Sequence, residues 1–263
     1  MRKLKILFIW LCLGGYLVTV LSFVRGRYDK QVCGAININI IDSLTNRFVT
    51  SDDVMKIMLE NGGNILGYPR HTINTYELED LLSGVPFIRN ATLYKTADGK
   101  LNADIIQRRP VLRVINQRGL SYYLDSEGVI LPVTPNYTSR VLVANGYISE
   151  PFLAESLKSI FKSEVPETRR NSVIFDLYDL ALFIDSSELW KAQITQIHVN
   201  NKYEYEMIPR VGAHVIKLGD AYNYVTKFRK LEAFYRYGLN SMGWNNYGEI
   251  NLKYENQVVC TKR

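Results

Sequence analysis

The chain has 263 residues, of which 47% are hydrophobic and 22% charged. This composition is that of a globular protein and excludes an intrinsically disordered chain. Half of the net charge of +6 comes from Arg2, Lys3 and Lys5, and the remaining basic residues form no long run. Because nucleic-acid binding needs clustered Lys and Arg, the charge pattern argues against a nucleic-acid partner.

An uncharged segment of nineteen residues lies between Lys5 and Arg25. As a helix it would rise about 28 Å, close to the thickness of the hydrocarbon core of a bilayer. We therefore expect a single N-terminal transmembrane helix at residues 6–24, after a cytoplasmic tail at residues 1–5 and before a juxtamembrane linker at residues 25–34. A cleaved signal peptide is the alternative, but the apolar run is longer than usual and lacks small residues at its end.

Residues 35–109 carry the signals of a small unit built as strand, helix, helix, strand, strand. Thr50 followed by Asp53 predicts a capping box at the start of the first helix, and Asn74 predicts a cap for the second. The dipeptide Asp98-Gly99 predicts a hairpin turn, in which both residues tolerate a positive φ. A unit of this order packs two helices on one face of a small sheet.

Residues 110–263 are predicted to form a mixed, mostly antiparallel β domain with flanking helices. Short strands are expected at residues 112–115, 122–124, 129–132, 140–143, 194–199, 203–208, 215–218, 248–254 and 257–261. Helices are expected at residues 151–161 and 175–190, and a further helix is expected to begin with Asp220 as its cap and to end at Gly238. We expect the last strand to have an open outer edge.

Histidine and cysteine residues are too few and too scattered to form a metal site. His71, His198 and His214 have no metal-binding spacing, so each is interpreted as a surface or strand histidine. Cys33 and Cys260 could form a disulfide, but we interpret them as free buried thiols. No nucleotide-binding or nucleophile motif occurs in the sequence.

Acidic pairs are the remaining candidates for catalytic residues. Asp52 and Asp53 lie in the first turn of a predicted helix, where carboxylates favour a capping role over acid and base chemistry. Asp176 and Asp179 have no basic or metal partner nearby in sequence, so they are interpreted as a solvated helix face. We therefore expect no catalytic residue, no cofactor and no metal, and the chain is predicted not to be an enzyme.

A series of short motifs follows in a fixed order along the chain. They are IIQRRP at residues 105–110, YLD at 123–125, EG at 127–128, LP at 131–132, RVLV at 140–143, IP at 208–209, LG at 218–219 and EINLKY at 249–254. In order and spacing these motifs resemble the bacterial cell-division proteins of the FtsQ/DivIB family, and the resemblance covers nearly the whole chain. It implies an α+β fold with a POTRA domain (β-α-α-β-β) at residues 35–109 and a β domain at residues 110–263.

The resemblance also implies a non-enzymatic scaffold of the divisome, which acts in septum formation. Such a protein is held in the inner membrane by its single span, with its folded domains in the periplasm and its location at the division site. The implied partners are coiled-coil proteins of the FtsB/DivIC and FtsL types, septal wall synthases through the POTRA domain, and membrane lipid around residues 6–24. No small-molecule substrate is implied.

In that family a partner adds a β-strand to the carboxyl-terminal end of the sheet. The corresponding candidates for partner binding here are Tyr254, Gln257, Val258, Val259, Cys260 and Thr261. An edge strand offers unpaired amides and carbonyls to an incoming chain. The alternative is that Lys262, Arg263 or a neighbouring loop covers the strand, which then binds nothing.

Three further alternatives stay open on the sequence alone. Arg108 and Arg109 could form a partner patch or a solvated strand end. The POTRA-like order of elements also suits a factor for envelope protein assembly or transport. A wall enzyme whose site carries no recognisable motif is the third alternative.

Overall fold

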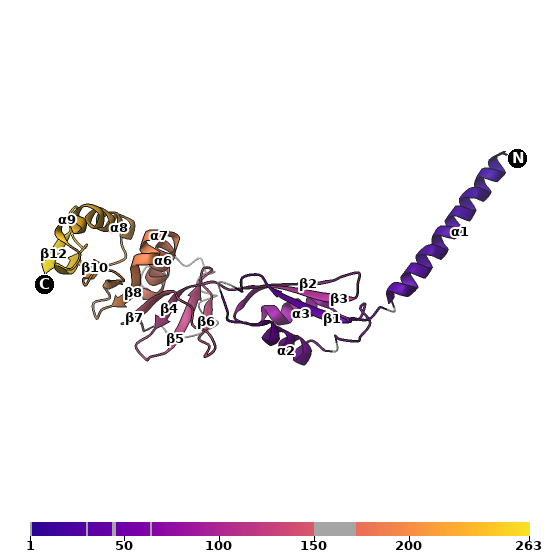
Figure 1. Ribbon diagram of the computed structural model, residues 1–263, viewed down its shortest axis with the longest axis horizontal. Helices are drawn as coiled ribbons and strands as arrows, with labels where there is room; N and C mark the ends of the chain where they lie inside the picture. The colour runs from indigo at the N-terminus through magenta and orange to yellow at the C-terminus, as the bar shows by residue number, and fades with distance from the viewer. Residues whose placement is uncertain (1, 30, 44–45, 64, 150–171) are drawn as a thin grey trace. The chain divides into compact units, whose positions relative to one another are not determined.

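The structure is a computed structural model that describes residues 2–29, 31–43, 46–63, 65–149 and 172–263 (Figure 1), without the side chains of residues 2–7 and 23–29. The chain folds into two compact units, Met1–Gln107 (unit 1) and Arg108–Arg263 (unit 2). Helices and strands are mixed in both units. The mixed α+β composition therefore agrees with the prediction, whereas the membrane span does not.

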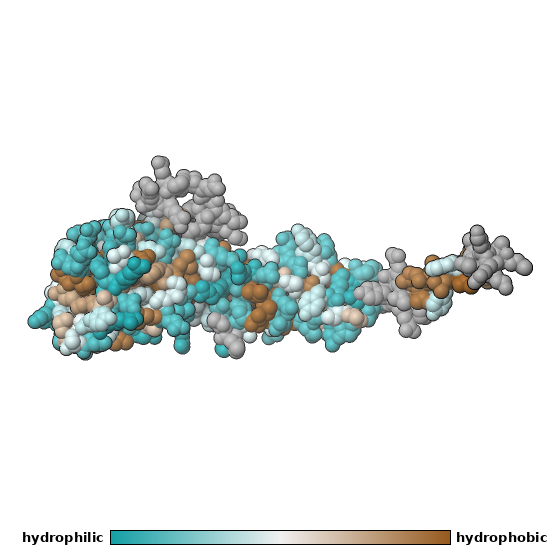
Figure 2. Space-filling view, turned by 90° about the horizontal axis from the view of Figure 1, so that it is seen from above, coloured by the Kyte–Doolittle hydropathy of each residue, from teal (hydrophilic) through white to brown (hydrophobic). Residues whose placement is uncertain are grey.

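The first helix corrects the prediction of a transmembrane helix at residues 6–24. α1 runs from Arg2 to Asp29, and its described side chains, residues 8–22, are exposed and mostly hydrophobic (Figure 2). Over the described residues, no helix is both long enough and apolar enough to cross a membrane.

Unit 1 has the predicted order of strand, helix, helix, strand, strand. Its elements are β1 (Ala35–Ile40), α2 (Ser51–Asn61), α3 (Thr75–Ser83), β2 (Ile88–Lys95) and β3 (Lys100–Gln107). β3 is the central strand, parallel to β1 and antiparallel to β2. α2 and α3 cover one face of this sheet (Figure 1), and Val54, Met58, Leu78 and Leu82 are buried there.

Local signals in unit 1 are confirmed, with one change in the turn. Thr50 and Asp53 form the capping box of α2, and the side chain of Asn74 accepts a hydrogen bond from the amide of Tyr76. The hairpin between β2 and β3 has a positive φ only at Gly99 (84°), not at Asp98. Thr96 and Lys100 close a three-residue loop, because the Thr96 amide donates to the carbonyl of Lys100. This loop type needs one left-handed residue at its last position.

Unit 2 is built around one nine-stranded mixed sheet. Its strands are β4 (Pro110–Ile115), β5 (Ser121–Asp125), β6 (Ile130–Pro132), β7 (Leu142–Gly146), β8 (Ile194–Val199), β9 (Tyr205–Pro209), β10 (Val215–Gly219), β11 (Tyr247–Asn251) and β12 (Val259–Lys262). Their order is β12-β11-β10-β9-β8-β7-β4-β5-β6. Three of the eight neighbouring pairs are parallel: β4 with β7, β7 with β8, and β10 with β11.

The helices of unit 2 differ from the prediction at several places. The helix expected at residues 175–190 is two helices, α6 (Val173–Ser186) and α7 (Glu188–Gln193), because the hydroxyl of Ser187 accepts the Trp190 amide and starts a new helix. The helix expected at residues 151–161 lies outside the described residues.

The last helical segment begins and ends at other residues than predicted. α8 (Tyr224–Ala233) begins after Asn223, and the carboxylate of Asp220 instead binds Lys227 Nζ at 2.5 Å. Gly238 does not end the helix, which continues as a π-helical segment, η1 (Phe234–Leu239), and a short α9 (Asn240–Met242). A Cβ at Gly238 would lie 2.7 Å from the Phe234 ring, so this glycine serves close packing within the helix.

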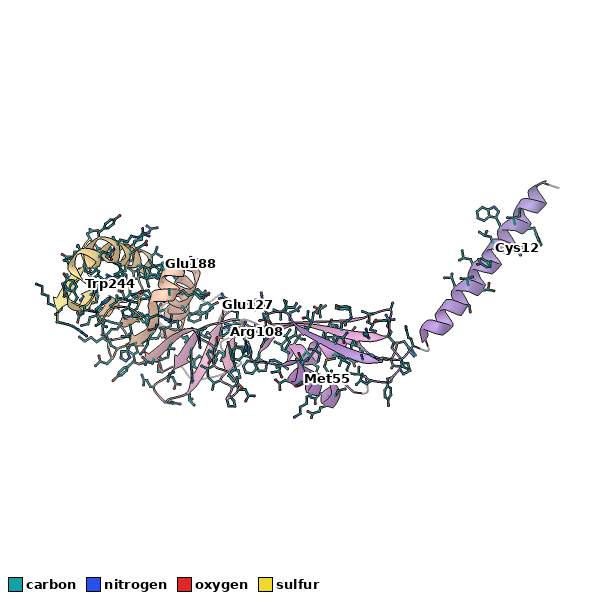
Figure 3. The ribbon with its side chains drawn as sticks, viewed as in Figure 1. Cys12, Met55, Arg108, Glu127, Glu188 and Trp244 are labelled. Carbon is teal, nitrogen blue, oxygen red and sulfur yellow. The ribbon has the colours of Figure 1, made fainter. Side chains whose placement is uncertain are left out.

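The two units meet in sequence at two consecutive residues that are both held by side-chain contacts. Gln107 is buried in unit 1, where its Nε2 donates to the Asn46 carbonyl at 2.8 Å and its Oε1 accepts the Val49 amide at 3.0 Å. Arg108 belongs to unit 2, and its Nη1 lies 2.9 Å from Asp125 Oδ2 and 3.2 Å from Glu127 Oε2 (Figure 3). The interpretation of Arg108 as a solvated strand end is therefore wrong.

The Arg108–Asp125 ion pair should make a large contribution to the stability of unit 2. Only 12% of the Arg108 side chain and 2% of the Asp125 side chain are exposed. We expect Arg108→Met to lower the free energy of unfolding by about 3 kcal/mol, because it leaves a buried carboxylate without its cation. Urea denaturation followed by the fluorescence of Trp190 and Trp244 would measure this.

The matched control is Arg109→Met. Arg109 Nη1 binds Asp185 at 2.6 Å, but 47% of its side chain is exposed, so its loss should cost less than about 1 kcal/mol. Equal effects of the two substitutions would contradict the assignment of a buried pair.

Candidate partner-binding edge

The carboxyl-terminal edge of the large sheet is formed by β12. β12 pairs antiparallel with β11, with Cys260 opposite Ile250 and Val259 opposite Asn251. The order of strands places no described strand on its other side. Four residues of backbone therefore have one side in the sheet and one side available.

The direction of each amide in β12 follows from two backbone hydrogen bonds. The Arg263 amide donates toward β11, to the Asn246 carbonyl, and the Leu252 amide donates toward β10, to the Lys217 carbonyl. Because amides alternate in direction along a strand, those of Val259 and Thr261 point to β11. The amides of Cys260 and Lys262 point outward.

The six predicted site residues lie together, but only three of them belong to the edge strand. Val259, Cys260 and Thr261 lie in β12, whereas Tyr254, Gln257 and Val258 lie in the connection before it. Val258 and Cys260 are half-buried and pack against the core of unit 2. Tyr254 and Val259 are 48% and 40% exposed, so the outward face offers both backbone groups and apolar side chains.

The connection between β11 and β12 is held at its start by two contacts of Lys253. The Lys253 amide donates to Asn251 Oδ1 at 3.0 Å, and Lys253 Nζ binds Glu204 Oε1 at 2.9 Å. The hydrogen bond from Lys253 lowers the pKa of Glu204, so this carboxylate stays ionised at neutral pH. Asn256 takes a left-handed conformation (φ 57°), as a turn at residues 255–256 requires.

Lys230 on α8 holds the same connection from the side. Its Nζ donates to the Leu252 carbonyl at 3.1 Å and to the Tyr254 carbonyl at 2.6 Å. Burial lowers the pKa of Lys230, and the charge of Lys227 lowers it further. Lys230 thus ties the helix to the segment that leads into β12.

The core beneath this edge contains a buried histidine. His214 is 2% exposed, and its Nε2 lies 2.9 Å from the hydroxyl of Tyr235 on η1. The Tyr235 ring packs edge-on against Trp244 (labelled in Figure 3), with centroids 5.0 Å apart. The interpretation of His214 as a surface or strand residue is therefore wrong, since it is a core residue just before β10.

The cysteine and acidic residues singled out in the sequence take different positions in the structure. Within the described ranges, no group of three or more His, Cys, Asp or Glu residues could hold a metal ion. Cys33 and Cys260 are both free thiols, the first buried and the second half-buried. Asp176 is not a solvated residue as predicted, because it is half-buried and accepts a hydrogen bond from the Tyr205 hydroxyl at 2.8 Å, and burial raises its pKa.

The two units match two different families of known proteins. Residues 109–261 match the family described as FtsQ/DivIB, C-terminal related. The chain belongs to this FtsQ/DivIB-related family. Residues 31–106 match a POTRA-like domain. No curated protein matches the chain.

Some residues of this FtsQ/DivIB-related edge carried no signal in the sequence. Lys262 is the last residue of β12 and points an amide outward, but its charge gives no strand signal. Lys230 lies about twenty residues before the carbonyls that it binds. Only the packing of α8 against the connection brings these groups together, so local patterns could not reveal the contact.

We expect Lys230→Met to loosen the edge of the FtsQ/DivIB-related unit. Two charge-assisted hydrogen bonds are lost, while the apolar part of the side chain is kept. Hydrogen exchange of the amides in residues 252–262 should become about tenfold faster. Arg229→Met, at an exposed position of the same helix, is the control and should leave these rates unchanged. Unaltered exchange in Lys230→Met would show that the hydrogen bonds of Lys230 are not needed to hold the edge.

The buried His214 should make the stability of unit 2 depend on pH. Burial lowers its pKa, because the protonated ring would lose its hydration. The unfolded chain, with a histidine pKa of about 6.5, then binds the proton more readily than the folded one. The stabilisation is therefore present above about pH 6.5 and is lost as the pH falls below it.

Urea denaturation between about pH 7.5 and 5 would measure this loss. His214→Gln keeps a hydrogen-bonding group for Tyr235 but does not titrate, so its stability should fall less over the same range. Parallel curves for the two proteins would rule out a contribution from His214.

Proposed function

We propose that this chain is a non-enzymatic scaffold of the bacterial cell-division machinery, which binds coiled-coil partners of the FtsB/DivIC and FtsL types by β-strand addition. The family match over residues 109–261 supports the general role in division. The open side of β12 is the single observation that supports this mode of binding, because its outward amides and carbonyls can pair with an added strand. The proposed place of action is the division site.

The geometry defines what an added strand would meet. The outward amides of Cys260 and Lys262 need carbonyl acceptors two residues apart, which any extended chain supplies. The exposed side chains of Val259 and Tyr254 suit apolar residues at alternate positions of the partner. Lys262 and Arg263 favour an acidic residue at the end of the partner strand that lies beside them.

Unit 1 has a separate place in this proposal. Its POTRA-like match supports a role as a docking domain, and septal wall synthases are the proposed partners. The match of unit 2 to a division-related family favours this reading over a factor for envelope protein assembly or transport.

Proline substitution at an outward amide tests strand addition without breaking the sheet of the protein itself. Proline removes the amide proton and is tolerated on the free side of an edge strand. We expect Lys262→Pro to weaken binding of the coiled-coil partner at least about tenfold, since a hydrogen bond is replaced by a clash with the added strand. Titration of the purified chain with the partner by calorimetry would measure the affinity.

Lys262→Ala is the matched control, because it removes the charge but keeps the amide. It should retain affinity within about threefold, the loss being that of a rim charge. Equal affinities for Lys262→Pro and Lys262→Ala would refute strand addition at β12. Capture of outer-membrane barrel precursors instead of division proteins in crosslinked cells would favour the assembly reading.

A further inference from the structure

A second candidate site lies in unit 2 at the carboxyl ends of three parallel strands. β4, β7 and β8 are neighbours and run in the same direction, so their carboxyl ends meet at one edge of the sheet. A shallow, open surface depression of about 470 Å³, called the cavity below, lies there. This volume lies in the range of about 300–1,000 Å³ that is usual for small-molecule sites.

The floor of the cavity is shaped by Gly146 at the end of β7. Its φ of 102° lies in the region that favours glycine, and a Cβ there would lie 2.2 Å from the Val199 carbonyl oxygen and 2.9 Å from the His198 ring. Any side chain at this position would therefore displace the ends of β7 and β8. The side chains of Asn145 and His198 line the cavity beside this glycine.

The side chains of Asn145 on β7 and His198 on β8 are joined by a hydrogen bond across the two strands. Asn145 and His198 are paired in register, and His198 Nδ1 lies 2.9 Å from Asn145 Oδ1. With Oδ1 as the acceptor, the Nδ1 proton is the donor and Nε2 is left as an acceptor. The amide nitrogen of Asn145 is then available as a donor beside it.

Asn116 places a further donor in the cavity wall from the end of β4. The residue is only 5% exposed. Its Oδ1 accepts the amides of Arg118 and Leu120 at 3.0 and 2.9 Å, which fixes the orientation of the side chain. Its Nδ2 makes no hydrogen bond with any residue that the structure describes, so it remains available as a donor.

The part of the cavity lining that the structure describes is uncharged and includes one exposed aromatic ring. It consists of asparagine, glutamine, histidine, tyrosine and isoleucine side chains and of Gly146. Tyr147 is 46% exposed. The amides of this lining supply paired donors and acceptors, which match the neighbouring hydroxyl groups of a sugar.

We propose that this cavity binds a neutral carbohydrate of one or two pyranose rings. The Asn116 and Asn145 amides and His198 Nε2 hydrogen-bond its hydroxyl groups, while the Tyr147 ring packs against an apolar face of the sugar. Ile115 offers an apolar surface on which the methyl group of an acetamido sugar would fit. This site is independent of the β12 edge and of its partner.

Calorimetric titration of the full chain with two neutral trisaccharides tests the proposal. One probe is the β-1,4-linked trimer of N-acetylglucosamine, and the other is the β-1,4-linked trimer of glucose. We expect binding of at least the first, with a dissociation constant on the order of millimolar. Binding of both would assign recognition to the hydroxyl groups, and binding of the first alone would assign it to the acetamido group.

Two variants test whether the binding occurs in this cavity. Tyr147→Ala and Gln117→Ala change exposed side chains and should each weaken binding, the first at least about tenfold. Tyr222→Ala is the matched control, since Tyr222 is 76% exposed in the same unit and outside the cavity lining. Lys262→Pro should bind the sugar as the wild type does, which separates this proposal from strand addition.

Failure of both trisaccharides to bind at about 10 mM would overturn the proposal. The same conclusion would follow if Tyr147→Ala and Gln117→Ala, with unchanged thermal unfolding, both bound the sugar as tightly as the wild type.

Discussion

The backbone of a β-sheet needs a hydrogen-bond partner for each amide and carbonyl, and at β12, one of the two edges of the sheet in unit 2, the described chain supplies partners on one side only. The strand is only four residues long and carries Lys262, features that limit unwanted pairing between copies. Lys230 holds the segment that leads into β12 through the carbonyls of Leu252 and Tyr254. β12 and β6 are the two edge strands of this sheet, and β12 is the one to which the proposed partner strand would be added.

Local residues determined much of unit 1, which is why its elements could be predicted. Thr50 and Asp53 satisfy free amides within one turn of helix, and Asn74 does the same within two residues. Gly99 takes the left-handed conformation that the hairpin loop needs. Each of these interactions spans at most a few residues, so the sequence pattern contains all that is required.

In unit 2 the prediction was wrong where a residue with the chemistry of a helix end has another partner in the folded chain. Asp220 has the chemistry of a helix cap, but Lys227 takes its carboxylate and the helix begins later. Gly238 has the chemistry of a helix end, but close packing of Phe234 uses it inside the helix. The last strand could be predicted from its alternation, whereas its status as an edge depends on the order of nine strands, which no local pattern contains.

The junction at Gln107 and Arg108 has a consequence for how the protein can be divided. One side chain is buried among the atoms of unit 1 and the next is ion-paired inside unit 2, so the chain has no spare linker between them. A truncation that starts after Arg108 would leave the carboxylate of Asp125 without this cation. One that stops before Gln107 would remove the side chain that binds the amide of Val49. Only a division at the peptide bond between Gln107 and Arg108 leaves each unit with the side-chain contacts that its own terminal residue makes.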